Sequence, residues 1–276
     1  MTAASAGPPG TGAGWRSDLA GTVALVTGAA ERVGAAIVLA LSQAGASVVI
    51  NHLGMAGQAA ALVSAIERAG GAAIAVDADI SSARQSGRLV QEAVTAFGRL
   101  DFVVHNASSF VRRPFLSLSE ADFERSFGVL VRGPLFLSQA AARVMTQQGS
   151  GKIIAIAGNS LYEAWPEHVG HALAKCTLAR MMELLAVALS PHVQCLVLAP
   201  DRVLAGNEPA AQQAAANGVH AARGEAAGDG LVTMPGGSKF RTGDADDVAS
   251  AVVWLCQSGR YLNGAVVPLD GGKSRY

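Results

Sequence analysis

The sequence predicts an α/β fold, a single doubly wound parallel sheet with helices on both faces. Short, continuous apolar runs recur along the chain, and such runs are typical of strands that a parallel sheet buries on both faces. Longer segments with helical periodicity separate these runs, which is the pattern of repeated βαβ units. A chain of 276 residues is long enough to bury about 70% of its unfolded surface in one such domain.

The expected elements follow in a regular order. The apolar run at 23–26 is the first strand, a glycine turn follows it, and a helix at 33–44 ends at Gly45. A second strand at 48–50 completes the first βαβ unit. Further helices are expected at 59–68, 83–97, 120–147, 168–189 and 245–256, and further strands at 73–76, 102–104, 152–156, 194–198 and 265–269.

Two segments lie outside this alternation. Residues 1–17 are mostly Ala, Gly, Pro and Ser without the basic and apolar stretches of a targeting peptide, and they predict a disordered tail before a domain at 18–276. Residues 201–243 are too long for an ordinary connection in an α/β fold. They predict a mobile lid over the substrate, with a flexible insertion of no function as the alternative.

Composition narrows the expected partners. Half of the residues are hydrophobic and only 15% are charged, which favours a homo-oligomer, a dimer or a tetramer, with large buried surfaces. The 21 basic and 21 acidic residues balance, so a small molecule is the expected partner, and neither nucleic acid nor a membrane surface is. The separated cysteines Cys176, Cys195 and Cys256 are interpreted as small buried side chains in a reducing, cytoplasmic compartment.

A glycine turn between the first strand and the first helix carries the main ligand signal. It reads Thr27-Gly28-Ala29-Ala30-Glu31-Arg32-Val33-Gly34. Gly28 permits a tight turn and Gly34 lets the helix approach the sheet, so that a pyrophosphate can sit on free amide groups at the helix N-terminus, around Val33. The position of the turn after a strand and before a helix predicts a dinucleotide cradle.

Residues around the second strand favour NADPH over NADH as the cofactor. Position 51, where an acidic side chain would bind the ribose 2′-hydroxyl of NADH, is Asn51, and His52 follows it. Arg32 in the glycine turn supplies a cation, and a cation without a carboxylate suits a 2′-phosphate. The alternative is that Arg32 is a solvated residue at the start of the helix.

With these motifs the chain resembles the short-chain dehydrogenase/reductase family, and within it the pteridine reductase-like branch, whose glycine turn has the form T-G-x-x-x-R-x-G. The resemblance covers about residues 20–276 and implies a Rossmann-like fold. It implies cofactor contacts for Asp79, Ile80, Asn106 and Ala107, and substrate contacts for Ser109 and Phe110. The matching motifs are Asp79-Ile80, His105-Asn106-Ala107-Ser108 in place of Asn-Asn-Ala-Gly, Ser108-Ser109-Phe110, Asn263-Gly264 and Asp270-Gly271-Gly272.

The chain departs from the family at the catalytic tetrad of Asn, Ser, Tyr and Lys, in which the phenol protonates a carbonyl oxygen. His171-Ala172-Leu173-Ala174-Lys175 stands where Tyr-x-x-x-Lys is expected, so the resemblance implies that Lys175 binds the cofactor and His171 replaces the phenol. Leu130 stands at the Asn position and Gly158 at the Ser position. Pro200-Asp201 replaces the Pro-Gly that lies under the nicotinamide, which makes Pro200 a cofactor contact.

His171 can act without help from a neighbour, because an imidazole titrates near neutrality. Lys175, one helical turn away, is expected to repel the imidazolium and to favour the neutral ring. We therefore expect His171 and Lys175 to be the catalytic residues, with His171 as a modest general acid or as a base. The alternative is a histidine in an inactive site.

The loop before His171 borders the substrate in the family that the chain resembles. Tyr162 and Trp165 in this loop are expected to stack on a heterocyclic substrate, although simple packing of the loop is an equal alternative. A metal site at Glu167, His168 and His171 is conceivable, but no metal is expected because no further set of spaced ligands accompanies them.

These observations favour an NADPH-binding reductase of atypical mechanism that acts on a small cyclic or conjugated C=N or C=O group. An iminium already carries its positive charge, so its reduction needs orientation more than a strong acid. Two alternatives stay open, because function resides in the site and not in the fold. One is a redox-neutral cyclase, isomerase or lyase that uses His171 and a loop carboxylate, and the other is a catalytically silent binding subunit.

Overall fold

A seven-stranded parallel sheet forms the centre of the molecule. The computed structural model describes residues 18–201, 203–204, 231–233, 239–259 and 261–275. The strand order is β11-β6-β5-β4-β1-β2-β3, and every pairing is parallel, so the predicted doubly wound sheet is confirmed. Its strands are β1 (Val23–Val26), β2 (Ser47–His52), β3 (Ala73–Asp77), β4 (Phe102–His105), β5 (Gly151–Ile156), β6 (Val193–Pro200) and β11 (Val266–Leu269). The strand order reverses at β1 and β4, where open α/β sheets bind their ligands.

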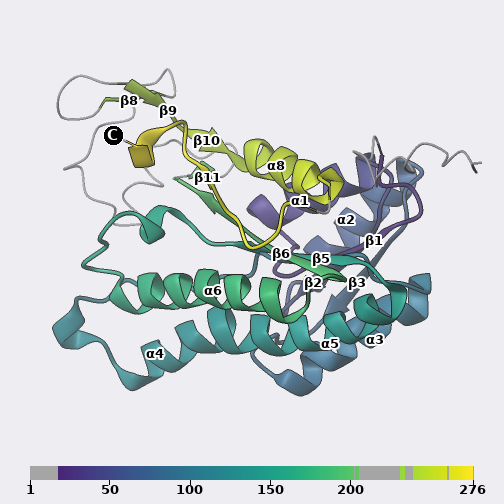
Figure 1. Cartoon of the computed structure of the whole chain (residues 1–276), viewed down its shortest axis with the longest axis horizontal. Helices are drawn as coiled ribbons and strands as arrows, with labels where there is room; N and C mark the ends of the chain where they lie inside the picture. The colour runs from purple at the N-terminus through teal and green to yellow at the C-terminus, as the bar shows by residue number, and fades with distance from the viewer. Residues whose placement is uncertain (1–17, 202, 205–230, 234–238, 260, 276) are drawn as a thin grey trace, which may run out of the picture.

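Helices cover both faces of this sheet, as Figure 1 shows. One face carries α1 (Arg32–Gln43), α2 (Ala56–Arg68) and α8 (Ala245–Gln257). The other face carries α3 (Ala83–Phe97), α5 (Gly133–Gln148) and α6 (Val169–Ala188), with α4 (Glu120–Phe127) before α5. In the part of the chain that the structure describes, no helix combines the length and the apolar character needed to cross a membrane.

Side chains along each strand point alternately to the two helix layers that cover the sheet. In β1, Ala24 and Val26 pack with the α1 and α8 layer, whereas Val23 and Leu25 pack with the α3, α5 and α6 layer. Successive side chains of a strand point to opposite faces, so a strand buried on both faces has to be apolar throughout. This is why continuous apolar runs, rather than alternating ones, mark the strands in the sequence.

The prediction of a single helix at 120–147 was wrong. The segment is interrupted by a π-helical turn at Gly128–Arg132, which separates α4 from α5. Pro134 follows this turn, and its ring carries no N–H for the carbonyl of Leu130, so a regular helix cannot run through it. A Cβ atom at Gly133 would also lie 2.8 Å from the Ile80 carbonyl oxygen, which shows how closely this turn packs against the sheet edge.

The three cysteines do not all behave as expected. Cys195 and Cys256 are buried, and burial raises the pKa of each thiol to about 12. Cys176 is exposed, contrary to expectation, because it lies on the outer side of α6. The apolar neighbours of Cys176 in the sequence therefore do not make it a core residue.

The expected tail and most of the expected lid lie outside the described residues. Within 201–243 the structure describes a parallel pair of β7 (Val203–Leu204) with β10 (Gly243–Asp244), and an antiparallel pair of β8 (Leu231–Thr233) with β9 (Lys239–Arg241). The mobility of a lid at about 201–243 and the disorder of residues 1–17 both stay predictions.

Candidate active site

The glycine turn after β1 is held at the carboxyl end of the sheet by contacts that leave no room for larger residues. Gly28 has a φ of 59°, and a Cβ atom there would lie 2.9 Å from the Cα atom of Ala107. A Cβ atom at Gly34 would lie 2.4 Å from the carbonyl oxygen of Gly28. Asn106 donates from its side-chain amide to the carbonyl oxygens of Thr27 and Gly28, at 2.9 Å and 3.0 Å. The turn is therefore a fixed cradle of backbone atoms.

A cavity of about 490 Å³ opens beside this turn. The structure brings most of the residues expected to contact the cofactor together around it, with Phe110 at the side where the substrate was expected. The cavity begins at the N-terminus of α1, where backbone amides are free to bind an anion. Its lining includes Gly28, Arg32, Val33, Gly34, Asn51, His52, Asp79, Ile80, Asn106, Ala107 and Phe110.

Arg32 lies exposed at the rim of the cavity with a φ of 53°, a conformation that is uncommon for a residue other than glycine. No acidic side chain in the described ranges forms an ion pair with it. The guanidinium is therefore available to a phosphate group, which it can bind with two parallel hydrogen bonds.

The polar atoms of the Asn51 side chain are used in hydrogen bonds within the protein. Its side chain is 2% exposed, and its amide nitrogen donates to the carbonyl oxygen of Ala78 at 2.9 Å. Its side-chain oxygen accepts the N–H of Gly28 at 3.4 Å. Asn51 thus links the glycine turn to the end of β3 and shapes the wall of the cavity.

His52 and Asp79 lie on the same wall. The Nδ1 atom of His52 accepts the backbone N–H of Met55 at 3.3 Å and lies 3.7 Å from Asp77 Oδ2. One oxygen of Asp79 accepts both the N–H and the hydroxyl of Ser81, at 2.9 Å and 2.7 Å. These bonds fix the two side chains in the cavity wall.

His171 and Lys175 lie one turn apart on α6, at the carboxyl end of β5. Lys175 donates from Nζ to the carbonyl oxygen of Ile156 at 2.6 Å, and burial lowers the pKa of Lys175 to about 8. Burial, with a smaller contribution from the charge of Lys175, lowers the pKa of His171 to about 4. At neutral pH the imidazole is therefore uncharged, as the spacing of the two residues predicts.

The hydrogen bond of His171 fixes its tautomer. Nδ1 lies 2.9 Å from the carbonyl oxygen of Ser109, and a carbonyl oxygen only accepts hydrogen bonds. Nδ1 therefore carries the proton, and Nε2 carries a lone pair. No group in the described part of the chain hydrogen-bonds Nε2. The geometry thus offers a proton acceptor.

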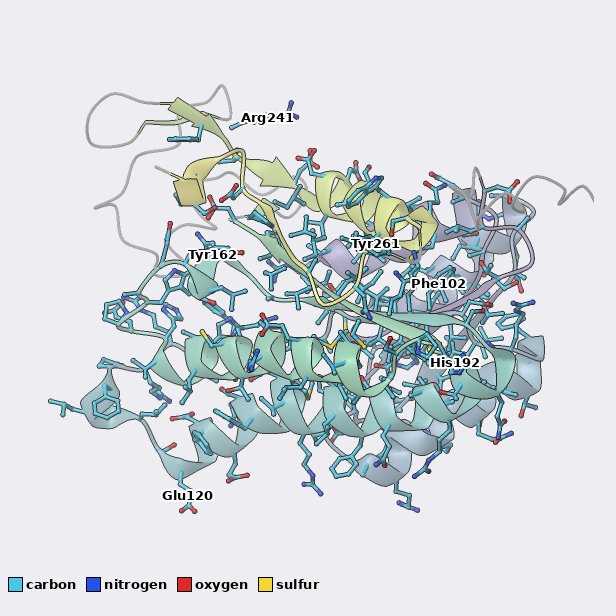
Figure 2. All side chains as sticks on the ribbon, viewed as in Figure 1. Phe102, Glu120, Tyr162, His192, Arg241 and Tyr261 are labelled. Atoms are coloured by element: carbon cyan, nitrogen blue, oxygen red, sulfur yellow. The ribbon has the colours of Figure 1, made fainter. Side chains whose placement is uncertain are left out.

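Aromatic rings surround His171. Its ring centroid lies 4.9 Å from that of Phe110, in an edge-to-face arrangement, and 6.3 Å from that of Trp165, in a stacked one. Phe110 also lies 4.5 Å from His168. Because Phe110 lines the cavity as well, it connects the cavity to His171. Tyr162, which is 45% exposed, stands on the loop above the first half of α6 in Figure 2.

The two loops that carry these rings are tied together. Arg112 donates twice to Glu167 Oε2, at 2.6 Å and 2.9 Å. Arg113 donates its backbone N–H to the carbonyl oxygen of Glu167 at 2.8 Å and forms a parallel bridge with His168. The Ser109–Phe110 segment is therefore held against the loop before α6, which fixes the hydrogen bond from His171.

Sequence reasoning missed a charged cluster at the same end of the sheet, here called the Asp201 cluster. It consists of Asp201, Lys273, Glu163 and Asn159. Lys273 Nζ lies 3.1 Å from Asp201 Oδ2 and 3.4 Å from Glu163 Oε1, and Asn159 donates its side-chain amide to Asp201 Oδ1. The replacement of the expected Pro-Gly by Pro200-Asp201 was the signal that this end of the sheet differs.

The remaining positions compared with the family's tetrad have no polar side chain. Leu130 is fully buried in the π-helical turn, and Gly158 has no side chain to offer. Pro200 lies at the end of β6, outside the lining of the cavity. Over the residues that the structure describes, no three His, Cys, Asp or Glu side chains group closely enough to hold a metal ion.

Comparisons with known proteins identify the family of the chain. The family model described as short chain dehydrogenase matches residues 22–215. An uncharacterised oxidoreductase of Methylorubrum extorquens is 36% identical over 93% of this chain and 99% of its own length. An L-rhamnose 1-dehydrogenase (NAD(P)(+)) of a Sphingomonas species is 31% identical over 92% of this chain and 96% of its own.

Solved structures give the same result. A short-chain dehydrogenase from Burkholderia cenocepacia in complex with NADP superimposes with a TM-score of 0.80 at 30% identity, covering 94% of this chain and 99% of its own. A dehydrogenase/reductase from Sinorhizobium meliloti superimposes with a TM-score of 0.80 at 31% identity, covering 92% of this chain and 96% of its own.

Proposed function

Because the chain belongs to the short-chain dehydrogenase/reductase family, and is therefore an oxidoreductase of that type, we propose that it uses NADP(H) and that His171 replaces the usual tyrosine. The substrate is a small molecule with a cyclic or conjugated C=N or C=O group. The resemblance of the glycine turn to the pteridine reductase-like branch supports a heterocyclic substrate. One observation carries the proposal: Phe110 lines the cavity beside the glycine turn and also contacts the His171 ring.

The residues around the cavity fit a nicotinamide dinucleotide. The amides at the start of α1 and the closely packed Gly28 and Gly34 suit a pyrophosphate, because side chains there would fill the space that the phosphates need. The guanidinium of Arg32, which forms no ion pair with any residue that the structure describes, suits the 2′-phosphate of NADP(H). When bound, this cofactor supplies or accepts the hydride.

His171 accepts a proton from an alcohol substrate, and it stays neutral when the substrate is a protonated C=N group. With Nδ1–H directed to Ser109, the Nε2 lone pair accepts a proton from a hydroxyl group when the substrate is an alcohol. A neutral imidazole donates no proton from Nε2, so reduction by NADPH favours a different substrate, a C=N group that is already protonated. Lys175, which is charged below pH of about 8, stabilises negative charge that develops on a substrate oxygen.

Two measurements test this function in sequence. The first is titration of the protein with NADPH and NADP⁺ by calorimetry, which is expected to give micromolar dissociation constants for both. The second follows the loss of NADPH absorbance with a panel of cyclic imines, cyclic ketones and pterins. An absence of binding at millimolar cofactor contradicts the proposal. Binding without oxidation of NADPH, together with a product of unchanged oxidation level, assigns a redox-neutral reaction instead.

A further inference from the structure

The segment 108–112 follows β4 and carries the carbonyl oxygen that binds His171, but few hydrogen bonds hold this segment in place. In the part of the chain that the structure describes, the backbone N–H groups of 108–112 donate no hydrogen bond. The backbone is anchored on either side, by the N–H groups of Ala107 and Arg113. Between these anchors, the position of the Ser109 carbonyl depends on side-chain contacts.

One side-chain pair joins this segment to the loop before α6. Arg112 donates from Nε and Nη2 to Glu167 Oε2, at 2.9 Å and 2.6 Å. Two donors of one planar guanidinium fix the direction of the contact as well as its distance. Glu167 directly precedes His168, the residue before the first turn of α6. The pair therefore fixes the Ser109 segment relative to the helix that carries His171.

The hydrogen bond from His171 to Ser109 becomes stronger during proton transfer. In the neutral ring, Nδ1–H donates to the Ser109 carbonyl at 2.9 Å. When Nε2 accepts a proton from an alcohol, the ring becomes positively charged and this hydrogen bond becomes a charge-assisted one. An interaction that is stronger in the transition state than in the ground state accelerates the reaction. A displaced Ser109 carbonyl loses this effect, and it also lets the ring carry its proton on Nε2, where no lone pair is then left for the substrate.

We propose that Arg112 is a positioning residue of the candidate active site, which holds the Ser109 carbonyl on Nδ1 of His171 through its pair with Glu167. This inference rests on the proposed role of His171 as a proton acceptor. Arg112 lies outside the lining of the cavity, so it acts through His171 and not on the cofactor. Since Arg112 is 48% exposed and Glu167 is 28% exposed, the contribution of the pair to any equilibrium is about fivefold at most. Loss of the pair is therefore expected to move the segment without unfolding the protein.

The tautomer of His171 is measured directly by the ¹⁵N chemical shifts of its ring, in protein labelled at histidine. This measurement needs neither cofactor nor substrate, and the signals of His171 are identified by their loss in His171→Asn. In the unchanged protein they are expected to show a protonated Nδ1 and an unprotonated Nε2. In Arg112→Gln they are expected to show a mixture of the two tautomers, because the Ser109 carbonyl is no longer held.

Steady-state kinetics give a second readout. Arg112→Gln is expected to lower kcat about threefold to fivefold, the most that one partly exposed ion pair contributes. KM and the dissociation constant of NADPH are expected to stay nearly unchanged, because Asn106 and Ala107 anchor the glycine turn independently of Arg112. Arg112→Lys keeps the positive charge but not the planar pair of donors, so it is expected to restore part of kcat and of the original tautomer.

The matched control is Arg88→Gln on α3, because Arg88 pairs with Glu92 and is also 48% exposed. This variant is expected to leave kcat and the tautomer of His171 unchanged. Thermal melting checks that each variant is folded, and Arg112→Lys keeps the test valid if Arg112→Gln is unstable.

Two results overturn the proposal. One is a His171 ring in Arg112→Gln with the same ¹⁵N shifts as in the unchanged protein, and the other is an equal change in Arg88→Gln. If the unchanged protein turns over no substrate, the proposed function fails, and that result is distinct because the ¹⁵N shifts still decide the role of Arg112.

Discussion

At His171, a single hydrogen bond decides what the imidazole can do. The carbonyl oxygen of Ser109 accepts a hydrogen bond from Nδ1–H, and burial together with Lys175 keeps the ring neutral, so only the lone pair of Nε2 is left for chemistry. A tyrosine at this position would donate a proton to the substrate, whereas the neutral ring of His171 can only accept one. In the proposed function, His171 therefore accepts a proton from the substrate, where the tyrosine of the family would donate one.

Replacement of His171 tests this role. His171→Ala is expected to lower kcat/KM by about 10²- to 10⁴-fold, the usual contribution of a general base. His171→Asn places an amide N–H where Nδ1–H now lies, so it is expected to keep the bond to Ser109 and the melting temperature but not the activity. Steady-state kinetics and thermal melting of both variants separate the two effects. If His171→Asn retains full turnover, the side chain only holds the loop.

The pH dependence follows from two shifted groups. His171 has its pKa lowered to about 4, so the base is present above that pH and is lost as the pH falls through it. Lys175 has its pKa lowered to about 8, so its charge is present below that pH and is lost above it. We expect a plot of kcat/KM against pH that is level between these values and falls on both sides. Activity that rises as the pH falls below 4 would mean that the imidazolium is an acid.

We expect Arg32 to determine the choice between NADPH and NADH, because its guanidinium is proposed to bind the 2′-phosphate of NADPH. Arg32→Gln is expected to weaken NADPH binding about 10- to 100-fold, the value of one or two charge-assisted hydrogen bonds, and to leave NADH binding nearly unchanged. Calorimetric titration of both cofactors against both proteins gives the four constants. Equal losses for NADPH and NADH would instead assign Arg32 to the shape of the glycine turn.

At the level of whole elements, the start of α1 requires glycine at position 34, because the turn leaves no room for a Cβ atom there. A Cβ atom at Gly34 would lie 2.4 Å from the carbonyl oxygen of Gly28 and 2.7 Å from the Cα atom of Ala29. Both neighbours are backbone atoms of the turn, so neither can move without displacing the cradle. Gly34→Ala is therefore expected to destabilise the protein by about 1–3 kcal/mol and to weaken NADPH binding at least tenfold.

Gly87 in α3 provides the matched control. No heavy atom lies within 4 Å of the Cβ that a substitution would add there. Gly87→Ala is expected to stabilise the protein by about 0.5–1 kcal/mol, because alanine restricts the unfolded chain and favours a helix. Urea unfolding and cofactor titration of both variants test the contrast. Equal effects of the two substitutions would remove the steric argument for Gly34.

Local sequence patterns predicted the helices and strands well, but they could not predict contacts between segments that are far apart in the sequence. The strand at 23–26 and the helix at 83–97 have the expected bounds, because periodicity is a local property. The four-residue spacing of His171 and Lys175 also placed both on one helix. Asn159 and Lys273, in contrast, lie 42 and 72 residues from Asp201 along the chain, and only the completed sheet brings them together.

At the scale of the whole molecule, α6 joins the site to the outer surface. Its inner side carries His171 and Lys175, and its outer side carries the exposed apolar residues Leu173, Leu184 and Val187. These positions repeat at helical spacing, so they form one stripe along the helix, in which Thr177 and the ion-paired Arg180 also lie. The charged fraction of 15% is low for a soluble chain, which fits apolar surface that a second copy covers.

We therefore propose that the protein is a homo-oligomer in which this stripe lies between two copies. Leu184 is 57% exposed in a single chain, and Leu184→Glu would bury a charge without a partner in such an interface, a change that costs several kcal/mol per copy. The expected result is a shift to monomers in sedimentation velocity. Trp254, which is 42% exposed and lies on α8 at the opposite face of the sheet, provides the control, and Trp254→Glu is expected to leave the sedimentation coefficient unchanged. Because α6 also carries His171, the dissociation caused by Leu184→Glu is expected to lower both the activity and the melting temperature. If the Leu184→Glu variant is still an oligomer, the contact between copies lies on another face of the protein.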